Sequence, residues 1–134
     1  VFAGKDKATV VTDTGVISDS ILRRMDDTTL LVLEANYDPH MLRFGPYQPF
    51  LKQRVASDEG HLSNEMAAQA LLMMNRPDFM QVILAHRSEN NNNAVLVTQT
   101  IGKMLVDGGV RIGPEMKLQH GQPNEIVSMK SVKR

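Results

Sequence analysis

The chain has 134 residues, with 15 basic and 15 acidic side chains and no cysteine. This length suits one domain, which at this size buries about 68% of the surface of its unfolded chain. The charge balance excludes a global attraction to nucleic acid or to an anionic membrane, and the lack of cysteine excludes disulfides, thiolate nucleophiles and zinc fingers. Neither a membrane helix nor a signal peptide is recognisable, so we expect a cytoplasmic protein without membrane contact.

The first quarter of the chain predicts a strand, a helix and a second strand. Residues 7–12 form a β-branched run, and residues 29–35 form a second, more apolar run. Between them, residues 17–25 place apolar side chains at helical spacing, with Ser18 or Asp19 available as the helix cap. Two strands joined by a helix are typical of a βαβ unit, so the pattern favours an α/β fold.

The middle of the chain differs in composition from the first quarter. Residues 36–49 contain repeated proline and glycine breaks, and we interpret them as a structured excursion over the surface. Residues 50–56 predict a short helix. A longer helix is predicted over 63–74, where Ser63 is the cap and Glu65 complements the helix dipole in the first turn.

The last part of the chain predicts another strand and helix. Residues 80–85 form a third buried strand, and the asparagine tract at 90–93 is interpreted as a turn with a helix cap. The following amphipathic helix ends at Gly108 and Gly109. Residues 110–129 predict two strands joined by a turn near residues 121–124.

Two candidate metal ligands stand where buried strands end. Asp13 follows the first strand and His86 follows the third, at the kind of position where α/β proteins collect functional groups. Each also has a structural interpretation. Asp13 lies in a turn-forming Thr-Asp-Thr-Gly sequence, and a single histidine at a strand end is often only hydrogen-bonded.

His61 and Glu34 are two further candidates. His61 precedes the helix predicted from Ser63, whose positive end favours anions, so it could act as a general acid or simply bond to the first turn. Glu34 ends the second strand and could orient a histidine, or it could pair with Arg54. The two other histidines, His40 and His120, are interpreted as surface residues.

Taken in chain order, several short segments resemble the C-terminal half of metallo-β-lactamase-fold hydrolases. The likeness is strongest to the YycJ/WalJ-type branch, with ribonuclease Z-like relatives, and it runs from about Lys7 to Leu105. The segments that carry it are Thr12-Asp13-Thr14-Gly15, Leu33-Glu34-Ala35-Asn36, Leu42-Arg43-Phe44-Gly45-Pro46-Tyr47, Leu51-Lys52-Gln53-Arg54, Ser57-Asp58-Glu59-Gly60-His61-Leu62-Ser63-Asn64-Glu65 and His86-Arg87-Ser88-Glu89-Asn90-Asn91.

The resemblance implies a four-layer αββα sandwich with a site for two divalent metal ions, zinc or manganese, at one edge. Asp13 would bridge the metals, and His86 would be the last histidine ligand of the second metal. His61 would assist catalysis beside the scissile phosphate, supported by Glu34. The implied reaction is attack on phosphorus by a metal-bridging hydroxide, with the two metals about 3.5–4 Å apart.

The resemblance further implies that residues 1–134 are the C-terminal part of one such domain. The N-terminal half, with its His-x-His-x-Asp-His motif, is not in the sequence. We therefore expect a metal-dependent phosphodiesterase or nuclease acting on DNA or RNA, of which this chain supplies part of the site. The alternative is a non-catalytic domain that binds a partner chain. Half of a two-sheet sandwich also exposes an apolar sheet face, so we expect self-association or pairing with the missing half.

Overall fold

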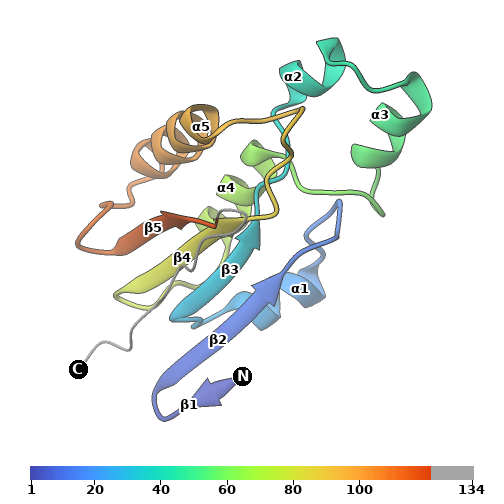
Figure 1. Cartoon of the computed structure of the whole chain (residues 1–134). Helices are drawn as coiled ribbons and strands as arrows, with labels where there is room; N and C mark the ends of the chain where they lie inside the picture. Colours follow the sequence, from blue (N-terminus) through green and yellow to red (C-terminus); the bar gives the residue numbers. More distant parts are fainter. Residues whose placement is uncertain (122–134) are drawn as a thin grey trace.

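The structure is a computed structural model that describes residues 1–121, and it is built on one mixed β-sheet (Figure 1). The strands lie in the order β1-β2-β3-β4-β5, and the last four run parallel, while β1 pairs antiparallel with β2. The α/β class predicted from the sequence is confirmed. The strands are β1 (Phe2–Ala3), β2 (Asp6–Val11), β3 (Leu30–Glu34), β4 (Met80–Ala85) and β5 (Met116–His120).

Most helices begin at the caps that the sequence indicates. Ser18 Oγ accepts from the Ile21 N–H and Ser63 Oγ accepts from the Met66 N–H, so serine is the cap in both cases. Asn93 caps the last helix, which confirms the interpretation of the asparagine tract. The helices are α1 (Asp19–Met25), α2 (Pro39–Phe44), α3 (Pro49–Val55), α4 (Asn64–Met73) and α5 (Ala94–Asp107).

The excursion at residues 36–49 is more regular than its sequence indicates, because it contains α2 and the start of α3. Pro39 and Pro49 occupy the first turn of these helices instead of interrupting regular structure. Proline is favourable at a first helical position, since it has no N–H to leave unpaired and its φ already suits a helix. Of the two strands predicted over 110–129, β5 is observed, and the predicted turn and second strand lie largely outside the described residues.

The hydrophobic core lies between one face of the sheet and three helices. Val11, Leu33 and Leu84 are cross-strand neighbours on β2, β3 and β4, and all three are buried in the core cluster. The same cluster contains side chains from α1, α4 and α5. Right-handed connections between successive parallel strands place their helices on the same face, which explains this arrangement.

The opposite face of the sheet carries a row of apolar side chains. Val10, Val32 and Ile83 are cross-strand neighbours, and side chains alternate along a strand, so they point away from the helices. Val10 is 68% exposed, and the other two are half-buried. Within residues 1–121, no helix packs on this row. We call Val10, Val32 and Ile83 the open face.

The described helices are all shorter than a helix that spans a bilayer. None of those within residues 1–121 has both the length and the apolar character that crossing a membrane requires.

Candidate metal centre

The site is built where β2, β3 and β4 end. Val11, Leu33 and Leu84 are in register across these strands, so the residues that follow them emerge at one edge of the sheet. Asp13 and His86 both adopt left-handed backbone conformations there, with φ of 59° and 55°. Such values are uncommon outside glycine but are tolerated best by Asn, Asp and His. The two residues therefore turn the chain and present their side chains at the same place.

Glu34 ends β3 and is the fully buried centre of the site. Its Oε1 accepts a hydrogen bond from His86 Nδ1 and lies 2.9 Å from His61 Nδ1. Its Oε2 accepts from the Leu62 N–H at 3.0 Å. A buried carboxylate needs such partners, because an unpaired charge in the interior is strongly unfavourable. Glu34 thus fixes the orientation of both imidazole rings.

His61 reaches this edge because the segment before α4 runs alongside the end of β3. The Asn36 N–H donates to the Leu62 carbonyl at 2.9 Å, and the Asn64 N–H donates to the Tyr37 carbonyl at 3.0 Å. These bonds extend the pairing of β3 by a short parallel bridge. His61 therefore stands beside Glu34 even though no regular strand contains it.

Two glycines let the surrounding loops approach closely. A Cβ on Gly15 would lie 1.7 Å from the Ser57 carbonyl oxygen, and the Gly15 N–H donates to the Asp58 carbonyl at 2.9 Å. A Cβ on Gly60 would lie 2.2 Å from the Arg54 carbonyl oxygen. Neither glycine has a positive φ, so close packing of backbone on backbone explains both residues.

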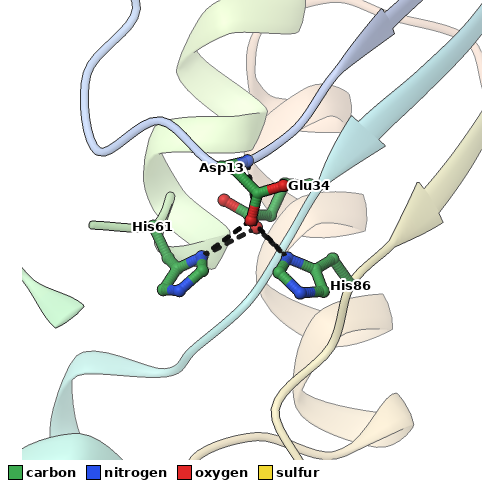
Figure 2. Close-up of side chains that lie close together, drawn as sticks. All are labelled: Asp13, Glu34, His61 and His86. Carbon is green, nitrogen blue, oxygen red and sulfur yellow. Dashed lines mark hydrogen bonds and ion pairs between the residues drawn. The ribbon is translucent and has the colours of Figure 1, made fainter. Parts of the chain in front are cut away.

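The four candidate residues converge, as Figure 2 shows. Asp13, Glu34, His61 and His86 each offer a ligand atom, and these atoms all lie within 4.8 Å of one another. Asp13 Oδ1 is 3.5 Å from His86 Nδ1 and 3.9 Å from His61 Nδ1. Ligand atoms around a tetrahedral zinc are about 3.3 Å apart, given metal–ligand bonds of about 2.0–2.1 Å. The donor set therefore suits a divalent cation, while the Nδ1 atoms of both histidines are engaged by Glu34, which leaves their Nε2 atoms free to act as ligands.

The side chains of the site differ in their exposure. The Asp13 side chain is 69% exposed and that of His86 is 48% exposed, whereas that of Glu34 is fully buried. The cluster is therefore open on the side of Asp13 and His86. Further ligands or a substrate can approach from that side.

Two buried asparagines hold the surrounding loops together. Asn64 Nδ2 donates to Asn92 Oδ1 at 3.0 Å, and Asn92 Nδ2 donates to Asn64 Oδ1 at 2.8 Å. Asn92 Nδ2 also lies 3.2 Å from the carbonyl oxygen of Ala35. The pair joins the start of α4, the end of β3 and the start of α5, and it was not singled out from the sequence.

Besides a cavity of about 630 Å³ that is lined by His86 and Arg87, two cavities that reach His61 adjoin the cluster. One, of about 330 Å³, is lined by His61 and His86 together with Tyr47 and Arg87. The other, of about 250 Å³, is lined by Asp13, His61 and Arg54. These neighbours were not assigned a role from the sequence. Arg87 has a local signal, since it directly follows His86 in the chain.

The alternative pairing of Glu34 with Arg54 is wrong. Glu34 is buried and bonded to the two histidines, whereas Arg54 is exposed on α3, and no ion pair within residues 1–121 joins the two. The remaining histidines lie away from the cluster; His40 is exposed, as expected, whereas His120 is half-buried. His40 stacks at 4.7 Å on Phe44, and His120 Nε2 lies 2.9 Å from Thr98 Oγ1.

These observations define an α/β protein with a carboxylate–histidine cluster, suited to a divalent metal, at the carboxyl edge of a parallel sheet. The chain is homologous to the exodeoxyribonucleases WalJ and YycJ. It is 35% identical to WalJ from two strains of Streptococcus pneumoniae, over 124 residues that make up 92% of this chain and 46% of WalJ. It is 32% identical to YycJ from Bacillus anthracis, over 117 residues that make up 87% of this chain and 44% of YycJ.

The chain therefore spans about half the length of these curated relatives, while nearly all of it is matched. No protein-family model matches the chain. No solved structure matches it significantly either.

Proposed function

We propose that the chain contributes to a metal-dependent DNA phosphodiesterase, an exodeoxyribonuclease like its relatives. The observation that carries this proposal is the convergence of Asp13, Glu34, His61 and His86 at one sheet edge. The relatives supply the substrate class, since WalJ and YycJ are both named as exodeoxyribonucleases.

In this proposal Asp13 and His86 are metal ligands, with Glu34 and His61 beside them. Zinc or manganese, as one ion or two, would supply positive charge to the phosphate oxygens and activate water for attack on phosphorus. Glu34 holds both rings through one oxygen, so it positions His86 as a ligand. His61 meets Glu34 through Nδ1, which leaves Nε2 to donate a proton to the leaving oxygen.

The proposal includes an architecture in which this chain is one half of an αββα sandwich. The open face would pack against a second sheet, and that half would supply further metal ligands to the exposed side of the cluster. Support comes from the half-length match to the relatives and from the 69% exposure of the Asp13 side chain.

The test is calorimetric titration of the chain with Mn²⁺ and Zn²⁺, with Asp13→Asn as the variant. Asparagine tolerates the left-handed backbone at this position but removes the carboxylate. We expect the ion affinity to fall at least about tenfold, as for other changes at metal sites. The matched control is Asp27→Asn, because Asp27 has the same φ of 59° but lies outside the cluster.

If neither ion binds, or if Asp13→Asn binds as tightly as the wild-type chain, the metal assignment is wrong. Activity is then measured as release of nucleotides from end-labelled DNA in the presence of the bound ion. Ion-dependent release that is lost in Asp13→Asn supports the nuclease. Ion binding without any release by the chain alone fits both a half-site that needs its second half and the second candidate, a partner-binding domain, for which the open face is the supporting observation.

A further inference from the structure

The helical hairpin next to the metal centre carries an unusual combination of side chains. Residues 39–57 contain three basic residues and no acidic one, although the whole chain has 15 of each sign. Figure 1 shows that α2 and α3 project together beyond the end of the sheet. We call five residues of this hairpin the α2–α3 surface, namely the exposed Arg43, Phe44, Phe50 and Arg54 and the half-buried Tyr47.

Large aromatic rings are exposed on this surface. Phe44 is 68% exposed and Phe50 is 65% exposed. The Arg43 guanidinium carbon lies 5.3 Å from the centroid of the Phe44 ring. Within residues 1–121, neither Arg43 nor Arg54 forms an ion pair with a carboxylate. The surface therefore presents two arginines that form no ion pair beside exposed rings, with Glu59 and Asp13 lining the same cavity as Arg54.

The same surface leads into the metal centre. Tyr47 lines the cavity of about 330 Å³ together with His61 and His86. Arg54 lines the cavity of about 250 Å³ together with Asp13 and His61. An extended ligand that crosses the cluster can thus continue onto the hairpin and stay in contact with the protein.

We propose that the α2–α3 surface binds single-stranded DNA and leads it to the metal centre. Phe44 and Phe50 stack on unpaired bases, while Arg43 and Arg54 contact phosphates. Exposed rings beside basic groups are the pattern of single-strand binding, because a base offers its face to a ring only when it is unpaired. The inference rests on the proposed function, since it specifies the form of that function's substrate.

The charge of the segment distinguishes DNA from a protein partner. A second copy of this chain brings equal numbers of acidic and basic residues, and its own hairpin would repel this one. A polyanion is complementary to Arg43, Lys52 and Arg54, which are the charged residues of segment 39–57, while the carboxylates of Asp38, Asp58 and Glu59 flank the segment.

The test measures the binding of a fluorescein-labelled oligothymidylate by anisotropy, in EDTA so that no metal contributes. The double variant Phe44→Ala/Phe50→Ala should bind at least about thirtyfold more weakly, since each of the two stacked bases contributes about 1–3 kcal/mol. Both rings are exposed, so the variant should keep the wild-type thermal midpoint. The matched control is Phe2→Ala, whose ring is 74% exposed on β1, away from the hairpin.

The phosphate contact of Arg54 is tested through the salt dependence of DNA binding. Arg54→Ala should reduce the slope of log affinity against log salt by about 0.7, the value for one lost phosphate contact with a single strand. Arg23→Ala is the control, because Arg23 is exposed in the last turn of α1. It should leave the slope unchanged.

Three results would overturn the proposal. They are no binding of the oligonucleotide by the wild-type chain, unchanged affinity in the double phenylalanine variant, and loss of self-association in that variant without loss of DNA affinity. The last result would assign the surface to a protein contact. Because these measurements are made without metal, their outcome is separate from the ion titrations that test the proposed function.

Discussion

At the residue scale, the site depends on a backbone conformation that most side chains avoid. Asp13 and His86 take φ of 59° and 55°, and both belong to the carboxylate–histidine cluster. A left-handed conformation is unfavourable by about 1–2 kcal/mol for an L-residue, so surrounding contacts must hold it in place. At His86, the carbonyl accepts from Asn36 Nδ2 at 2.7 Å and the ring bonds to Glu34. The unusual turns are thus tied to the ligands themselves.

His120 gives the molecule a pH-dependent contribution to stability. Burial lowers the pKa of His120 below its usual 6.5, and the positive charge of Arg87 lowers it further. Below pH 6.5 the unfolded chain takes up a proton here that the folded chain does not, so the stability of the fold decreases as the pH falls. The loss is complete below the pKa of the folded state.

We therefore expect His120→Gln to lessen the decrease in urea midpoint between measurements above and below pH 6.5. Glutamine can retain the hydrogen bond with Thr98, which in the wild type spans 2.9 Å. His40→Gln is the control, since His40 lies on the exposed side of α2 and should leave the pH dependence as in the wild type. A wild-type pH dependence in His120→Gln would contradict the assignment.

At the scale of the elements, the site is held by loops that are bonded to one another. The reciprocal amide pair of Asn64 and Asn92 joins the start of α4 to the start of α5. Asn92 also bonds to the carbonyl of Ala35, which follows β3. Both asparagines are buried. Removing one amide leaves the other without its reciprocal partner in the interior, although Asn92 keeps its bonds to Ala35 and Asn93, and such a loss costs more per group than removing both amides.

Asn64→Ala and Asn92→Ala should each lower the free energy of unfolding by about 1–3 kcal/mol. The double variant should lose less than the sum of the two, because the second substitution removes a group that has already lost its reciprocal partner. Urea denaturation of the four proteins of this cycle measures the coupling. Asn90→Ala is the control, since Asn90 is exposed in the same tract and should change stability by less than about 0.5 kcal/mol. Additive losses in the double variant would argue against the amide pair.

At the scale of the whole molecule, the sheet is covered by helices on one face only within residues 1–121. The open face presents Val10, Val32 and Ile83 in a row across neighbouring strands. Glu34 follows Val32 by two residues on β3, so its side chain starts from the same face. The carboxylate–histidine cluster therefore lies at the carboxyl end of the open face, the side on which the proposed second sheet would bring further ligands.

The isolated chain should self-associate through this face in sedimentation velocity experiments. Val10→Lys should shift the distribution toward the monomer, because a charge in an apolar interface loses its water. Val95→Lys is the matched control, since Val95 is 63% exposed on α5 and Val10 is 68% exposed on the open face. A monomer at all concentrations, or an equal shift in both variants, would contradict the prediction.

Much of the secondary structure could be predicted from local signals. Apolar β-branched runs gave β2, β3 and β4, and the serine and asparagine caps gave the starts of α1, α4 and α5. Helix α2 was missed because Pro39 is equally consistent with a break and with a first helical turn. The Asp38 side chain caps this helix by accepting a hydrogen bond from the Met41 N–H. That bond exists only once the first turn of the helix has formed.

The sequence by itself determined that Asp13, Glu34 and His86 follow apolar strands, since alternation and composition act over a few residues. Only the tertiary structure decided that they meet. Convergence requires three parallel strands in register, a short bridge that brings His61 to the end of β3, and close backbone packing at Gly15. The tertiary structure also decided that Glu34 pairs with His61 and His86 and not with Arg54. Such contacts join residues far apart in the chain, so their partners are set by how the elements pack.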